Sequence, residues 1–187
     1  GNAGGTNALR TQGFWFAAAT VVIDVGKGWL AAGWLPGLEI PGIAADPAVA
    51  RGWLTAACAA AAVTGHVWPL FHEFRGGKGG ATLVGALLAL APLVVLVVLA
   101  IWLVVVMLTG LVGLATMTAA VCVPVAIWVL GPAGEPLLSF AIAMAALVVF
   151  AHRSNIGRMN AGTEPRMNRL WLLRPDADGP GSEGPGG

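Results

Sequence analysis

The stretch "PLVVLVVLAIWLVVVML", residues 92–108, contains no charged side chain. A run of this kind is typical of a helix in a lipid bilayer, which needs about 20 mostly apolar residues to cross. The chain contains five further apolar segments, at residues 13–35, 49–65, 80–91, 113–130 and 136–151. None alternates apolar and polar residues as barrel strands do, so we read all six as helices. The predicted fold is all-α, a polytopic integral membrane bundle of about six transmembrane helices.

The composition agrees with a protein built for a membrane. Hydrophobic residues make up 57% of the 187 residues and charged residues 10%, with a mean hydropathy of +0.81; soluble domains carry about 25% charged residues. We expect a single membrane domain over residues 1–174 and a disordered tail, "PDADGPGSEGPGG", over 175–187. The two cysteines lie in apolar runs without metal-ligand spacing. We expect no metal, no cofactor and no nucleic-acid partner.

Positive charge is concentrated in three polar segments, here called islands, at residues 1–10, 72–80 and 152–164. Eight of the ten Lys and Arg residues lie in these islands or just after the last one. The loop over residues 36–47 carries two acidic residues and no Lys or Arg. By the positive-inside rule this loop faces outward, and the three basic islands face the cytoplasm.

The segment at residues 80–91 is too short to cross a bilayer. The chain between the second island and the third must cross an even number of times, and its 71 residues from 81 to 151 are too many for two crossings. Four crossings are needed, yet a helix of this segment's length reaches only about 18 Å against a core of about 30 Å. Four crossings become possible if the glycine-rich loop before this segment enters the membrane, so that the short helix starts partway across. Such backbone is tolerated where it lines a site.

That loop, "HEFRGGKGGAT" at residues 72–82, has features that suit a phosphate. Its glycines at 76, 77, 79 and 80 let backbone N–H groups approach a ligand, and Lys78 adds positive charge at the start of a helix. The strict P-loop spacing is absent and no strand precedes the loop. On this motif alone, a structural turn remains an equal alternative.

Two other polar groups lie in or beside apolar segments. The island "HRSNIGRMNAGTE", 152–164, places His152, Asn155 and Arg158 on one side of a helix, followed by Glu164. These side chains either converge on a ligand or are solvated caps at a membrane surface. Asp24 and its i+3 neighbour Lys27 are either functional or a salt bridge that holds the bundle.

Together these motifs resemble the bacterial membrane glycerol-3-phosphate acyltransferases of the PlsY type. "GNAGGTNALR" at residues 1–10 is similar to the family's first motif, "GHVWPLFHEFRGGKGGAT" at 65–82 to its second and residues 152–164 to its third. "DVGKG" at 24–28 fits the Asp-x-x-Lys-Gly of the family's second helix. The family has seven membrane helices, so the first would be missing here, as is the serine that precedes Gly1 in the family motif.

The resemblance implies transfer of a fatty acyl group from acyl phosphate to the 1-hydroxyl of glycerol 3-phosphate, forming lysophosphatidate at the bacterial inner membrane. Membrane lipids and a soluble enzyme that forms acyl phosphate are further implied partners. The implied catalytic residues are His152, Asn155 and Lys78. The implied substrate-binding residues are Asn2, Thr6, Asn7, Arg10, Lys27, Gly76, Gly77, Gly79, Thr82, Arg158 and Glu164.

Two other activities compete with this interpretation. A transporter or channel for an anionic solute would also need an intramembrane charge pair and a re-entrant glycine loop, although no inverted repeat is evident. An acyl-CoA enzyme of the His-x4-Asp class would need an Asp five positions after a His, and none of the three histidines has one. The sequence leaves open whether His152 or the phosphate of the substrate takes the hydroxyl proton.

Overall fold

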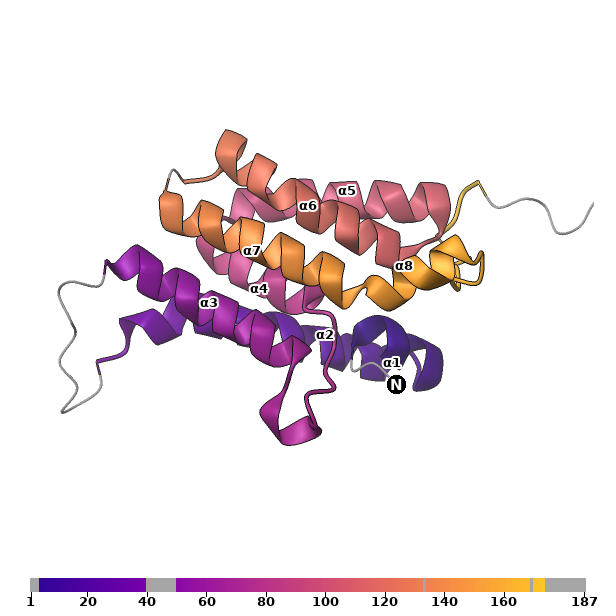
Figure 1. The fold of residues 1–187 in the computed structure, drawn as a ribbon, viewed down its shortest axis with the longest axis horizontal. Helices are drawn as coiled ribbons and strands as arrows, with labels where there is room; N and C mark the ends of the chain where they lie inside the picture. Colours follow the sequence, from indigo (N-terminus) through magenta and orange to yellow (C-terminus); the bar gives the residue numbers. More distant parts are fainter. Residues whose placement is uncertain (1–3, 40–49, 133, 169, 174–187) are drawn as a thin grey trace, which may run out of the picture.

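The structure is a computed structural model that describes residues 4–39, 50–132, 134–168 and 170–173. Within these residues every regular element is a helix (Figure 1). The α-helices are α1 (Gly5–Thr11), α2 (Phe14–Trp29), α3 (Arg51–Val67), α4 (Gly80–Leu90), α5 (Pro92–Thr109), α6 (Val112–Leu130), α7 (Glu135–Ala151) and α8 (Arg153–Asn160). A π-helical turn, Leu30–Trp34, and two short 3-10 turns, Leu35–Gly37 and Leu70–His72, complete the set.

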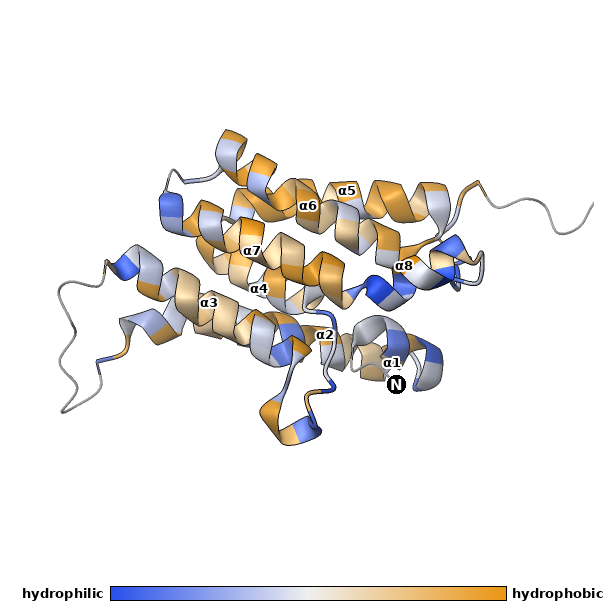
Figure 2. Ribbon diagram, viewed as in Figure 1, coloured by the Kyte–Doolittle hydropathy of each residue, from blue (hydrophilic) through white to orange (hydrophobic). Residues whose placement is uncertain are grey.

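The six predicted apolar segments correspond to α2 through α7. Their ends agree with the prediction to within a few residues, and α5 begins at the proline of the stretch quoted above. Hydrophobic residues dominate α5, α6 and α7, whereas hydrophilic residues gather in α1, α8 and the loop after α3 (Figure 2). The all-α prediction is confirmed for the described residues. Helix α1 was not predicted, because its glycine-rich sequence has no apolar face of its own.

The helices differ in their capacity to cross a membrane. Four segments are long and apolar enough to cross alone: Phe14–Gly37, Arg51–His72, Pro92–Thr109 and Val112–Leu130. Helices α7 and α8, bent by 51° at His152, make a fifth candidate. Helix α4 has 11 residues, about 17 Å, and is too short. It begins nearer the middle of the bundle than the turn between α5 and α6 does (Figure 1).

Helices α2 and α4 cross at van der Waals contact between their backbones. A Cβ atom on Gly28 would lie 2.1 Å from the carbonyl oxygen of Thr82, and one on Gly85 would lie 2.0 Å from that of Val25. Small residues of this kind let membrane helices approach closely. The crossing fixes the first turn of α4, and with it the loop that carries Lys78, against α2.

Candidate active site

The bundle contains a cavity of about 950 Å³, with one polar end and one apolar end. Each of the helices α1 to α8 contributes to its wall. The polar end is lined by Thr6, Asn7, Arg10, Lys78, Gly79, His152, Asn155, Arg158 and Glu164. The apolar end is lined by Val21, Val25, Leu83, Leu87, Val98, Leu99, Ala119, Ala120 and Val123, among others. The cavity therefore suits a ligand with a charged head and a long apolar chain.

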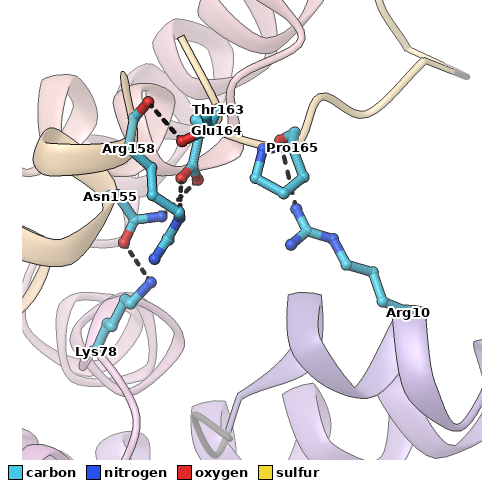
Figure 3. Close-up of polar contacts among 7 residues, drawn as sticks. All are labelled: Arg10, Lys78, Asn155, Arg158, Thr163, Glu164 and Pro165. Atoms are coloured by element: carbon cyan, nitrogen blue, oxygen red, sulfur yellow. Dashed lines mark hydrogen bonds and ion pairs between the residues drawn. The ribbon is translucent and has the colours of Figure 1, made fainter. Parts of the chain in front are cut away.

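A chain of hydrogen bonds organises the polar end (Figure 3). The Lys78 ammonium donates to Oδ1 of Asn155. Asn155 Nδ2 donates to Oε1 of Glu164 at 2.6 Å, and Arg158 Nε donates to Oε2 of the same carboxylate at 2.7 Å. Asn155 and Glu164 are buried, 5% and 9% exposed. Residues from the loop, α8 and the segment after α8 are thus held in one rigid group.

Helix α1 faces this group from across the cavity. Arg10 donates to the carbonyl oxygen of Pro165 at 3.5 Å (Figure 3), and Thr6 and Asn7 line the same wall. Among the residues that the structure describes, the Arg10 guanidinium has this single acceptor, which leaves other N–H donors for a ligand.

The positive charges of the polar end outnumber the negative ones. Burial is the main cause that lowers the pKa of Lys78, and the positive charges of Arg158 and Arg10 lower it further against the opposing effect of Glu164. Three cations thus face one carboxylate. A bound anion would relieve this repulsion, so the polar end is electrostatically prepared for phosphate.

His152 lies at the bend between α7 and α8. Its Nδ1 is 2.8 Å from the carbonyl oxygen of Val148, which can only accept, so Nδ1 carries the proton and Nε2 is the free acceptor. His152 is buried, 4% exposed, and lines the polar end of the cavity.

Several predicted site residues lie elsewhere. Lys27 and Gly76 line a second, smaller cavity of about 350 Å³. Gly77 lines neither cavity; its backbone N–H donates to the carbonyl of His66. Thr82 is fully buried at the α2–α4 crossing, and its hydroxyl has no partner in the described structure. Asn2 lies outside the described residues, as does the predicted tail.

Gly113, in the first turn of α6, is a site residue that the sequence reasoning missed. A Cβ atom there would lie 2.8 Å from Nδ2 of Asn155. The absence of a side chain at this position leaves room for the amide that joins Lys78 to Glu164. Its only sequence signal is a glycine in an apolar helix, which has many causes.

The described His, Cys, Asp and Glu side chains form no group of three that could hold a metal ion. The donors of the polar end are instead ammonium, guanidinium, amide and imidazole groups. These are the groups that bind phosphate directly.

A helical membrane bundle with a cavity that joins cationic donors to an apolar channel is the arrangement expected of an enzyme acting on lipids. A family model described as glycerol-3-phosphate acyltransferase matches residues 1–162, and the chain belongs to this family. It is 37% identical over 175 residues to a glycerol-3-phosphate acyltransferase of Synechococcus sp. (strain JA-3-3Ab), covering 94% of this chain and 80% of that protein. A homologue from Burkholderia thailandensis is 38% identical over 169 residues, with coverage of 90% and 79%.

Solved structures agree with this assignment. The crystal structure of PlsY (YgiH), an integral membrane glycerol 3-phosphate acyltransferase, in its lysophosphatidic acid form has a TM-score of 0.78 to this fold at 33% identity, covering 92% of this chain and 83% of that chain. Its glycerol 3-phosphate form has a TM-score of 0.76 at the same identity, with coverage of 89% and 78%. The resemblance stated from the motifs is thereby confirmed, and the chain is an integral membrane protein.

Proposed function

We propose that this protein transfers a fatty acyl group from acyl phosphate to the 1-hydroxyl of glycerol 3-phosphate, forming lysophosphatidate for phospholipid synthesis. The main observation behind the proposal is that one cavity joins a cluster of three cations and one carboxylate to an apolar channel within the bundle. Both substrates carry phosphate and one carries a long alkyl chain. Family membership supports the acceptor, and the missing His-x4-Asp base argues against acyl-CoA as the donor.

The cluster can divide the two phosphates between its two sides. Lys78, Gly79 and the first turn of α4 would hold the acyl phosphate, because a helix N-terminus and an ammonium both favour an anion. Arg10 and Arg158 would hold the phosphate of glycerol 3-phosphate. Asn7 and Thr6 supply neutral polar contacts on the α1 side.

The acyl chain would occupy the apolar end of the cavity. Leu87, Val98 and Val123 are buried around it and belong to α4, α5 and α6. The carbonyl of the acyl phosphate would then lie between this channel and Lys78, next to the acceptor hydroxyl. Because phosphate is already a good leaving group, this placement is the main requirement for the reaction.

The reaction forms one bond and breaks one. The hydroxyl oxygen of glycerol 3-phosphate attacks the carbonyl carbon, the carbon–oxygen bond to phosphate breaks, and inorganic phosphate leaves with the electron pair of that bond. The hydroxyl proton passes to the departing phosphate, whose oxygens are basic once the carbon–oxygen bond breaks. His152 Nε2 would then orient the hydroxyl by accepting its hydrogen bond.

We further propose that the site faces the cytoplasm from the bacterial inner membrane, where a soluble enzyme would supply acyl phosphate. The positive-inside rule supports this orientation, since the islands around Arg10, Lys78 and Arg158 hold most of the basic residues. Cysteine labelling of intact cells near Arg10 and Arg158 should give protection from outside at both positions. Labelling of the two from opposite sides would contradict the orientation.

The function is tested with purified protein in phospholipid nanodiscs. Lysophosphatidate should form from glycerol 3-phosphate and palmitoyl phosphate, and not from palmitoyl-CoA. Equal turnover with palmitoyl-CoA would overturn the donor assignment. Uptake of glycerol 3-phosphate into vesicles without product would instead support a transporter.

A further inference from the structure

A second group of charged side chains consists of Asp24, Lys27 and His66. Asp24 and His66 line the same cavity as the acyl-transfer cluster, and all three line the smaller cavity. Asp24, on α2, is buried at 6% exposed. Its Oδ1 is 2.6 Å from the Lys27 ammonium and 3.2 Å from Nδ1 of His66 on α3. The ammonium and the imidazole are themselves 2.5 Å apart. Three polar groups from two helices thus satisfy one another within a mostly apolar bundle.

The backbone of His66 and its neighbour Val67 also binds the glycine-rich loop through hydrogen bonds. The N–H of Gly77 donates to the carbonyl of His66 at 3.1 Å, and the N–H of Gly76 donates to that of Val67 at 3.2 Å. A Cβ atom on Gly76 would lie 2.0 Å from the His66 oxygen, so the loop lies directly on the last turn of α3. Lys78 follows one residue after Gly77. The side chain of His66 is held by Lys27 and Asp24, which pair with each other on α2, while its backbone holds the loop.

We infer that Asp24, acting through His66, is a positioning residue for Lys78. The carboxylate on α2 fixes the last turn of α3, this turn fixes Gly76 and Gly77, and the loop then presents the Lys78 ammonium to Asn155. The cluster is charge-balanced, in contrast to the cationic end of the cavity. A carboxylate would also repel a phosphate, which makes direct binding of the charged substrate groups by Asp24 unfavourable.

The structural test compares Asp24→Asn with Glu73→Gln. Both changes turn a carboxylate into an amide, but the Glu73 side chain is 84% exposed on the same loop, 3.9 Å from Arg75. In hydrogen–deuterium exchange of the full chain, peptides covering residues 74–80 should exchange at least about tenfold faster in D24N than in wild type, and at the wild-type rate in E73Q. Unchanged exchange in D24N would overturn the inference.

The kinetic test rests on the proposed function, and wild-type and E73Q activity establish that function independently. D24N should lower kcat about tenfold with little change in KM, and should have less than a twofold effect when Lys78→Ala is already present, because both changes act on the same group. Additive losses would mean that Asp24 contacts substrate directly. A loss of folded protein with unchanged activity per folded molecule would reduce the pair to a salt bridge that holds the bundle; either result overturns the inference.

A second variant covers the possibility that D24N does not fold. His66→Gln leaves the Asp24–Lys27 pair intact and breaks only the link from α2 to the loop-bearing turn. It should reproduce the faster exchange at 74–80 and the lower kcat. Wild-type exchange and kcat in H66Q would overturn the inference whatever D24N does.

Discussion

The two charged groups, one around Lys78 and one around Asp24, differ in how their charges are balanced. In the first group, Lys78, Arg158 and Arg10 face the single carboxylate of Glu164, and the repulsion contributes to the lowered pKa of Lys78. In the second, one carboxylate, one ammonium and one imidazole contact one another, all within 3.2 Å. The first group has donors left over for an anion, whereas the second satisfies itself.

This difference separates substrate binding from support. Charge inside a membrane protein is costly unless it is paired or used. An unbalanced group persists because a ligand completes it, and a balanced group persists because it holds two helices in register. Substitutions in the first group should therefore change activity more than folding. The loss of activity should be larger for a residue that lies closer to the bound phosphate.

The largest effect is expected at Lys78. Lys78→Ala should lower kcat/KM by roughly ten- to hundredfold, the cost of about 1.5–3 kcal/mol for a lost charge-assisted hydrogen bond. Lys78→Arg should recover only part of the rate, because a planar guanidinium is larger than an ammonium beside a loop that admits no side chain at Gly76. Steady-state assays with palmitoyl phosphate measure both.

Arg75→Ala is the matched control, since its side chain lies on the same loop and is 84% exposed. It should retain activity within about twofold of wild type, as expected for exposed surface charge. A Lys78→Ala enzyme with wild-type kinetics and a wild-type melting temperature would remove the loop from the active site.

Glu164→Gln should have the next largest effect. It keeps an acceptor for Asn155 but removes the charge that Arg158 pairs with at 2.7 Å, so we expect about a tenfold lower kcat/KM, equivalent to about 1.4 kcal/mol. Glu164 raises the pKa of Lys78, so its loss lowers that pKa further. Because Lys78 must be protonated to hold phosphate, the alkaline limb of the pH–rate profile should move to lower pH.

Glu135→Gln is the control for this substitution, at the exposed start of α7. Its pH–rate profile should superimpose on that of wild type. An E164Q profile that keeps its alkaline limb in place would show that the Lys78 ammonium is not the titrating group.

The sequence predicted the helices well and the site unevenly. Long apolar runs leave a membrane chain few alternatives to helices, so α2 to α7 lie close to where they were expected. Lys78, Asn155, Arg158 and Glu164 were found because polar side chains stand out in an apolar chain. Helical spacing predicted that Asn155 and Arg158 share one side of α8, with Glu164 after a turn, but not their contact with Lys78.

Other features required the tertiary structure. The i, i+3 spacing of Asp24 and Lys27 predicts a pair but not which cavity each faces, and only Asp24 borders the larger one. Thr82 matches a family motif, yet the tight crossing of α2 and α4 buries it. Helix α1 could not be predicted because its position depends on packing against α2.

A substitution at the apolar end of the cavity should have a smaller effect, which is selective for long acyl chains. Ala120, 4% exposed on α6, lines it. Ala120→Leu should raise KM for palmitoyl phosphate about five- to tenfold relative to a short-chain acyl phosphate, since a lost methylene contact is worth about 1–3 kcal/mol. Val121→Leu, on the neighbouring residue that is 55% exposed, should leave the ratio unchanged. Equal sensitivity of long and short chains to A120L would place the acyl group elsewhere.

The smallest effect should come from Gly113, which touches the cationic group without carrying charge. An added Cβ would lie 2.8 Å from Asn155 Nδ2 and 3.2 Å from its Cβ, so Gly113→Ala must displace the amide that links Lys78 to Glu164. A strain of about 1 kcal/mol, at the low end for overpacking, corresponds to about a fivefold loss of kcat/KM. Gly157→Ala on α8, where an added Cβ meets nothing within 4 Å, is the control and should be silent. If G113A lowers the melting temperature but leaves kcat/KM intact, the Asn155 amide can move without moving the Lys78 ammonium, and the cationic group is less rigid than its hydrogen bonds indicate.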